Sequence, residues 1–258
     1  MPQPNLPSAY NLITLDCVDS TNTEARRRAL LGEQITPDGT LIWAKEQTEG
    51  YGRQKKSWFS PPGNLYFSLI LRPEIKINRA ADFSFIAALA MFDTLGSIGN
   101  AGNQVQIKWP NDILLNKRKV AGFILETETK EQDVLDWIII GLGLNVAVFP
   151  GETDFPATSL RAEGWGATET DALEYFCRHF LKWTNIWRTE GFYPIRKNWL
   201  WHAFGKGDEV KVKIKNKLIT GTFEDLDKDG TLLIKSTNKI HKIAAGDIYF
   251  TSLGIEEI

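Results

Sequence analysis

Two short segments of the 258-residue chain combine several cations with glycine or proline, and both could bind an anion. The first reads GYGRQKKSW at positions 50–58. Glycines let backbone N–H groups come close to a ligand, and the cations complement negative charge. The segment therefore indicates a phosphate or carboxylate clamp, although an exposed basic hairpin loop without a ligand would have the same composition.

The second segment reads KWPND at positions 108–112 and is followed by RKVAG at 118–122 and by Glu126. A lysine buried in a strand hairpin is costly unless a negative group lies beside it, so Lys108 and Lys119 indicate an anionic ligand or a paired carboxylate. A polar β-turn formed by Asn-Asp and Asn-Lys would explain the same residues equally well.

A strand and a helix precede these segments. LITLDCV, from Leu12, reads as a short strand that ends at Asp19. Thr21 as the helix N-cap would place Glu24 at the third helical position and complete a capping box, with the helix continuing over residues 25–31.

The middle of the chain predicts more strands than helices. Apolar periodicity predicts a helix over 80–95, with Gly96 as its stop, and a second over 171–187. Strands are expected at 40–45, 65–71, 105–109, 113–115, 120–126 and 137–148. Strands flanked by helices, without strict alternation, predict an α+β fold with a mixed sheet.

The pattern changes after residue 205. Val210, Val212 and Ile214 alternate with lysines, as in a half-buried strand, and DKDG at 227–230 is a hairpin turn signal. We therefore expect a domain over 1–205 and a small β-barrel over 206–258 that packs against it.

Charge and composition exclude several classes of protein. Thirty basic and thirty-two acidic residues leave a net charge of −2, which argues against a nucleic-acid-binding surface. The N-terminus lacks the pattern of a secretory signal, and the apolar runs are too short to cross a membrane. The two cysteines, Cys17 and Cys177, show no disulfide or zinc spacing, so we expect a cytoplasmic protein.

Read in order, five segments resemble the biotin protein ligases (biotin–[acetyl-CoA-carboxylase] ligases), and the resemblance covers nearly the whole chain. They are DSTN at 19–22, Gln47 with 50–58, KWPND at 108–112, RKVAG at 118–122 and GLGLN at 141–145. The resemblance implies a catalytic domain like that of class II aminoacyl-tRNA synthetases, followed by an SH3-like barrel. It also implies a two-step reaction in which ATP and Mg²⁺ convert biotin to biotinyl-5′-AMP, and a lysine of a carboxylase biotin carrier domain then takes the biotinyl group.

The resemblance also assigns roles to single residues. Arg53 and Lys119 match the residues that hold the biotin carboxylate and the adenylate phosphate, Lys108 adds to their field, and Asp112 is suited to orient the incoming lysine amine. Trp58 would cover the ligand, and no residue is assigned to a metal. The remaining positions are biotin contacts at Ser20, Thr21, Asn22, Gln47, Gly50, Tyr51, Gly52 and Gly122, and ATP contacts at Arg53, Trp58, Lys108, Asn111, Lys119 and Asn145. GLGLN can equally be the end of a buried strand.

The loop at 50–58 departs from the family pattern GRGRxGRxW. Tyr51 replaces an arginine, Lys55 a glycine and Lys56 an arginine, while Arg53 is retained. A lysine lacks the guanidinium fork and cannot adopt glycine-only conformations, so these changes bear on loop ordering and adenylate retention more than on the reaction.

Other functions stay open at this stage. A lipoate–protein ligase would use the same chemistry, although no RRxxGGG-like segment occurs; a non-catalytic biotin- or adenylate-binding module would keep affinity without turnover. A DNA-binding regulator would need a basic recognition helix, and DSTN begins at residue 19, so we expect a monofunctional protein that binds neither DNA nor membrane. The sequence leaves a homodimer open.

Overall fold

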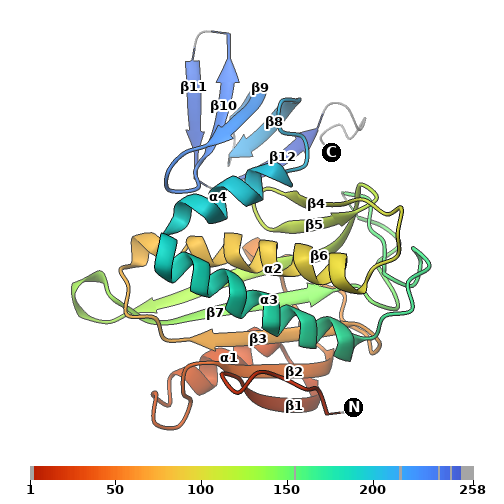
Figure 1. The fold of residues 1–258 in the computed structure, drawn as a ribbon, viewed down its shortest axis with the longest axis vertical. Coiled ribbons are helices and arrows are strands. Elements are labelled where there is room, and N and C mark those ends of the chain that lie inside the picture. Colours follow the sequence, from red (N-terminus) through yellow and green to blue (C-terminus); the bar gives the residue numbers. More distant parts are fainter. Residues whose placement is uncertain (1–2, 154, 215–216, 238, 245, 251–258) are drawn as a thin grey trace.

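The computed structural model describes residues 3–153, 155–214, 217–237, 239–244 and 246–250, which form two β-sheets and four α-helices (Figure 1). The larger sheet has the strand order β1-β2-β3-β7-β6-β5-β4. Only β1 and β2 pair in parallel, so the sheet is mixed, as predicted. Its strands are β1 (Asn11–Val18), β2 (Thr40–Gln47), β3 (Leu65–Leu71), β4 (Val105–Lys108), β5 (Asp112–Leu115), β6 (Arg118–Thr129) and β7 (Leu135–Leu144).

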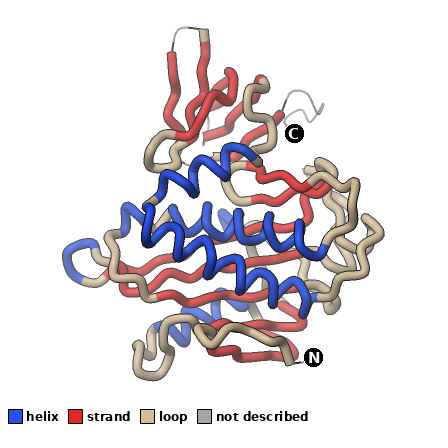
Figure 2. The backbone as a smooth tube through the Cα atoms, in the orientation of Figure 1, coloured by secondary structure: helices blue, strands red, loops and turns tan. Residues whose placement is uncertain are grey.

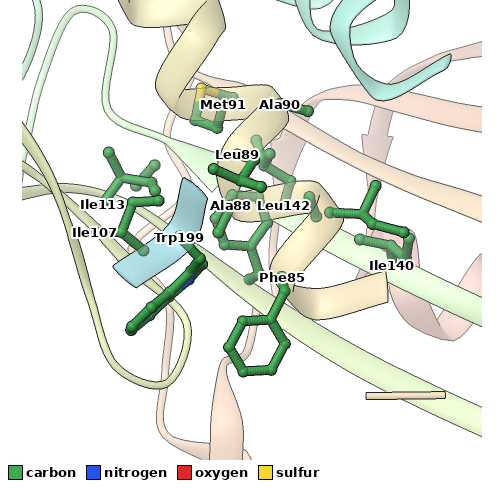
Figure 3. Packing of buried hydrophobic residues seen from close by; sticks show 14 of the residues in the cluster. Phe85, Ala88, Leu89, Ala90, Met91, Ile107, Ile113, Ile140, Leu142 and Trp199 are labelled. Atoms are coloured by element: carbon green, nitrogen blue, oxygen red, sulfur yellow. The ribbon is translucent and has the colours of Figure 1, made fainter. Parts of the chain in front are cut away.

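Helices cover the two faces of this sheet unequally (Figure 2). α2 (Asp82–Ile98), α3 (Glu169–Glu190) and α4 (Phe192–Trp201) lie on one face and bury the main core. Figure 3 shows part of this core, with Leu89 and Met91 of α2 and Ile140 and Leu142 of β7 among its members. α1 (Thr21–Ala29) packs on the other face against Ile42, Ile70 and Ile139. The short 3-10 helices are Arg53–Lys55, Ile77–Arg79 and Glu131–Asp133.

The segment Ile77–Ile98, which contains α2, is long and apolar enough to span a membrane by length and composition. Most of it is buried inside the protein, however, and a helix that is apolar on all sides is typical of a core position. Its apolar surface is therefore explained by packing against the sheet and α3.

The C-terminal part forms a five-stranded antiparallel sheet, as predicted, with the order β11-β10-β9-β8-β12. Val210 and Val212 are buried while Lys211 is half-buried, so the alternation in the sequence is confirmed. Phe250 packs edge-on against Phe204 of the larger unit, with ring centroids 4.5 Å apart. The strands are β8 (Glu209–Ile214), β9 (Lys217–Leu226), β10 (Leu232–Ser236), β11 (Lys239–Ile243) and β12 (Asp247–Phe250).

Three local predictions were wrong. The N-cap of α1 is Ser20, not Thr21, and no side chain caps it; Glu24 instead pairs with Arg27 and Arg28. α2 runs past Gly96 and ends at Ile98, with Gly99 as its C-cap, because a lone glycine inside a well-packed helix costs only about 1 kcal/mol.

The third error concerns the strand predicted to reach residue 148. β7 ends at Leu144, because the backbone N–H groups of Val146, Ala147 and Val148 all turn to the side-chain oxygen of Asn64. The helix α4 was also missed. Both cysteines are free, and burial raises the pKa of the Cys177 thiol well above its ordinary value.

Candidate active site

A cavity of about 480 Å³ opens on the face of the large sheet that α1 covers only in part. Along β7 the side chains on this face are Trp137 and Ile139, which pack with α1, and then Gly141 and Gly143, which leave the space open. The strand alternation thus changes from large side chains to none at the point where α1 begins. The glycines form the floor of the cavity.

A network of polar side chains fixes one end of the cavity. The Thr21 backbone N–H and hydroxyl both face Gln47 Oε1, at 2.8 and 3.1 Å. Gln47 Nε2 donates to Ser60 Oγ at 2.9 Å, and Ser60 Oγ donates to the Trp58 carbonyl at 2.8 Å. Because each donor has a defined acceptor, the orientation of the Gln47 amide is set.

Asn22 presents an unpartnered donor to the same end. Its Oδ1 accepts from the hydroxyl of the buried Ser68 on β3, at 2.5 Å, which directs the amide nitrogen away from Ser68. Asn22 is only 2% exposed, and among the described residues its Nδ2 has no hydrogen-bond partner. A buried amide without a partner is costly, so this end of the cavity favours an uncharged ligand that carries an acceptor oxygen.

The loop over 50–58 covers the cavity as a small hairpin. A side chain at Gly50 would collide with Ser60 Oγ, and one at Gly143 would collide with the indole of Trp58. The indole therefore lies directly on the glycine floor, and a Cβ at Gly122 would meet its edge at 3.2 Å. Trp58 covers the strip of floor between the polar end and the cationic end.

The cationic end is formed by two lysines around one carboxylate. Asp112 is buried, and its oxygens lie 2.6 Å from Lys119 Nζ and 3.4 Å from Lys108 Nζ. Burial raises the pKa of Asp112, but the charges of Lys119 and Lys108 outweigh it and hold the pKa below its ordinary value. Of the two partners that the sequence left open for these lysines, an anionic ligand or a paired carboxylate, the structure shows the paired carboxylate, Asp112.

A β-bulge aims Lys119 into the cavity. The register between β5 and β6 shifts so that Ile113 pairs with Ala121 and Leu114 with Lys119, which leaves Val120 as the extra residue. Without the bulge, Lys119 would share the face of the buried Ala121 and Phe123. The extra residue instead places Lys119 on the face of Gly122.

Three of the predicted site residues have contacts within the protein that limit what else they can bind. The amide nitrogen of Asn111 donates to the Phe123 carbonyl, and that of Asn145 donates to the Thr158 carbonyl at 3.0 Å. Arg53 reaches toward the C-terminal sheet and donates to the Gly246 carbonyl at 3.3 Å. Asn111 and Asn145 therefore have evident structural roles in addition to lining the cavity.

The cavity gathers every site residue predicted from the sequence except Gly50, which packs behind Gln47. Sequence reasoning missed the residues that shape the cavity or hold its polar side chains. Alternating glycines at 141 and 143 were the available signal for the floor, whereas nothing local marks Ser68. The missed residues are Ser60, Ser68, Phe123, Gly141, Gly143, Phe155, Ile248 and Tyr249.

We expect Gly141→Ala to weaken ligand binding at the polar end at least tenfold. The added Cβ would lie 2.1 Å from Asn22 Oδ1, so the amide would be displaced and its hydrogen bonds lost. Titration calorimetry with biotin, the ligand implied by the sequence, measures this. Gly96→Ala is the control, because a Cβ there meets nothing within 4 Å; equal binding by both variants would contradict the assignment of the floor.

A mixed sheet backed by helices, with a cavity that offers hydrogen bonds at one end and cations at the other, defines a class of protein: ligases that activate a carboxylic acid with a nucleotide. The comparisons with known proteins are more specific. Residues 14–145 match the model of the biotin/lipoate A/B protein ligase family, and residues 207–251 match the biotin protein ligase C-terminal domain. The chain belongs to the biotin/lipoate A/B protein ligase family.

Individual relatives agree with this assignment. The chain is 35% identical over 242 residues to the biotin–[acetyl-CoA-carboxylase] ligase of Paracoccus denitrificans, covering 90% of this chain and 97% of that protein. It is also 35% identical over 244 residues to the bifunctional ligase/repressor of Bacillus subtilis, covering 92% of this chain and 73% of that protein. The biotin protein ligase of Aquifex aeolicus, solved with biotin and ATP, aligns with a TM-score of 0.77 and 28% identity over 93% of this chain and 97% of that chain.

Proposed function

We propose that the cavity binds biotin and ATP, forms biotinyl-5′-AMP and transfers the biotinyl group to a lysine of a carboxylase carrier domain. The activity is that of a biotin–[acetyl-CoA-carboxylase] ligase, the name borne by the Paracoccus relative. We choose biotin as the substrate on one observation: the amide nitrogen of Asn22, at the polar end of the cavity, is buried and has no partner among the described residues. The ureido carbonyl of biotin supplies the acceptor that this amide needs, and the hydroxyl of Ser20, which lines the same cavity, is an acceptor for a ureido N–H group.

In the first step, an oxygen of the biotin carboxylate attacks the α-phosphorus of ATP. An O–P bond forms, the bond to the β-phosphate oxygen breaks, and pyrophosphate leaves. Because the two reactants are both anionic, the site has to offset their repulsion, and Lys119, Lys108 and Arg53 supply positive charge around the point of attack.

In the second step, the neutral ε-amine of the carrier lysine attacks the acyl carbon to form an N–C bond. The C–O bond to the phosphate breaks, AMP leaves as its phosphate anion, and the proton of the amine passes to water. Asp112 faces the cavity as a carboxylate whose lowered pKa makes it a hydrogen-bond acceptor for the amine and a poor proton acceptor. Its role is therefore to orient the incoming lysine. Trp58, lying over the floor, keeps water from the reactive anhydride.

Mg²⁺ fits this site as a companion of ATP. Within the described residues no group of three His, Cys, Asp or Glu side chains could hold a metal, and Asp112 is already paired with two lysines. Mg²⁺ binds phosphates readily while keeping much of its water shell. Bound to the triphosphate, it would reduce the negative charge that the lysines have to neutralise.

The remaining assignments complete the proposal. Residues 1–205 form the catalytic domain, and 206–258 form the C-terminal domain, whose Ile248 and Tyr249 line the cavity. We place the protein in the cytoplasm, where carboxylases and ATP are found together.

Mass spectrometry of a carrier domain tests the proposal. Incubation with biotin, ATP, Mg²⁺ and this protein should add one biotinyl group to a single carrier lysine, and omission of any component should prevent it. Lipoate in place of biotin should give no modification, because its dithiolane ring offers no acceptor to Asn22. An unmodified carrier in the complete mixture would contradict the proposal.

Asn22→Leu should lower biotin affinity by about 1–3 kcal/mol, or roughly 5- to 150-fold, because the ureido oxygen loses its donor inside a buried pocket. The affinity for lipoate should fall much less, so the ratio of the biotin affinity to the lipoate affinity should decrease. Titration calorimetry with both acids gives the two constants. Asn185→Leu, at an exposed position of α3, is the control and should leave both constants unchanged.

A further inference from the structure

Tyr51, which lines the cavity, ties the loop over 50–58 to the body of the protein. Its hydroxyl donates to Glu126 Oε1 on β6, at 2.9 Å. The other oxygen of Glu126 pairs with Arg26 of α1. The loop is thereby linked through one carboxylate to the sheet and to the helix whose first turn lines the cavity.

Contacts within the loop also converge on Tyr51. Tyr51 pairs with Ser57 as an isolated β-bridge, and the Gly52 N–H donates to the Lys56 carbonyl at 2.8 Å. Between them Gln54 and Lys55 take positive φ angles of 54° and 59°, as in the tight turns of β-hairpins.

Positive φ is unfavourable for lysine, which stands here where the family pattern has glycine. Lys55 Nζ lies 3.6 Å from the centroid of the Tyr51 ring, a cation–π contact that offsets this cost. Two of the three residues at which the loop departs from the family pattern, Tyr51 and Lys55, are therefore in contact with each other, and the turn does not depend on a ligand for its shape.

We propose that Tyr51, acting through Glu126 and Arg26, is a positioning residue that holds the loop closed before a ligand binds and so slows release of the acyl-adenylate. Arg53 and Trp58 lie within the hairpin that Tyr51 fixes, and Trp58 covers the cavity floor. Because the loop is ordered in advance, less conformational entropy is lost on binding. This inference rests on the proposed function, since the adenylate is its product.

A double-mutant cycle between Tyr51 and Glu126 tests the link. Tyr51→Phe removes only the hydroxyl and keeps the ring beneath Lys55, and Glu126→Ala removes the acceptor. Each variant should release biotinyl-5′-AMP about three- to tenfold faster. The double variant should release it no faster than Glu126→Ala alone, because that single variant has already lost the Tyr51–Glu126 hydrogen bond together with the Arg26 pair. Glu128→Ala is the matched control, because Glu128 is an exposed glutamate two residues after Glu126 on the same strand, β6.

A second measurement separates this inference from the proposed function. Trypsin cleavage after Lys55 and Lys56 in the ligand-free protein should be three- to tenfold faster in Tyr51→Phe and Glu126→Ala, at unchanged thermal midpoint. If the wild-type protein forms no adenylate, the proposed function fails while the cleavage rates still test the link. The inference would be overturned if Tyr51→Phe released biotinyl-5′-AMP and was cleaved by trypsin at the wild-type rates. It would also be overturned if the effects of Tyr51→Phe and Glu126→Ala on adenylate release were fully additive.

Discussion

Biotin adenylation should fall by about 10²- to 10³-fold in Lys119→Ala, while biotin affinity changes by less than tenfold. The asymmetry follows from the place of Lys119. Its ammonium group lies at the cationic end, beside Asp112 and 5.2 Å from the centre of the Trp58 ring, away from the amide of Asn22 that recognises the ureido group. Removing one preorganised charge from the point where the transition state gains charge costs about this much in rate.

Biotin-dependent exchange of labelled pyrophosphate into ATP measures the first quantity, and titration calorimetry the second. Arg118→Ala is the matched control, because Arg118 is the preceding residue on β6 but pairs with Glu163, outside the cavity lining. It should keep the exchange rate. A non-catalytic biotin-binding module would show no exchange in the wild-type protein, and a wild-type exchange rate in Lys119→Ala would exclude Lys119 from the reaction.

The bulge that aims Lys119 shows where sequence reasoning stops. A strand over 120–126 and a turn at 116–117 follow from apolar residues and turn formers; both are present, and the strand, β6, extends over Arg118–Thr129. Strict alternation from Ala121, however, would place Lys119 in the core. The resemblance to a family assigned the correct face, because a single extra residue in a strand leaves no signal in composition or periodicity.

At the polar end of the cavity, too, some residues could be predicted from the sequence and others could not. Ser20, Thr21 and Asn22 form a recognisable motif, and the start of a helix could be predicted there. Ser68, which orients Asn22, lies in the middle of an apolar strand 46 positions away. Contacts of this kind depend on sheet register and on the angle at which α1 crosses the sheet, neither of which is written in local sequence. The missed α4 follows a helix break at Gly191, where a new helix begins without a side-chain cap.

Asp112→Asn should lower the free energy of unfolding at neutral pH by about 3–5 kcal/mol, because it removes the buried carboxylate charge that lies 2.6 Å from Lys119 Nζ and 3.4 Å from Lys108 Nζ. Lys108 is only 8% exposed and cannot recover full hydration by a small movement. Urea unfolding measures the loss. Asp16→Asn is the control, since that carboxylate is exposed and its pair with Lys45 lies in water, so its midpoint should stay at the wild-type value.

The loss of the Asp112 charge beside the two lysines, and not a general defect of packing, is the expected cause of this instability, and a second substitution tests that. Lys108→Met in the Asp112→Asn background removes one buried cation while keeping the side-chain volume, so the double variant should be more stable than Asp112→Asn alone.

The pH dependence of the free energy of unfolding gives an independent check. The pKa of Asp112 is lower in the folded protein, so its contribution is complete above the ordinary carboxyl pKa of about 4 and is lost as the pH falls through the lowered value. The stability difference between wild type and Asp112→Asn should therefore be constant from pH 6 to pH 8 and shrink below about pH 4. A difference that is independent of pH down to acid unfolding, or a double variant less stable than the single, would show that the buried charge pair is not the cause.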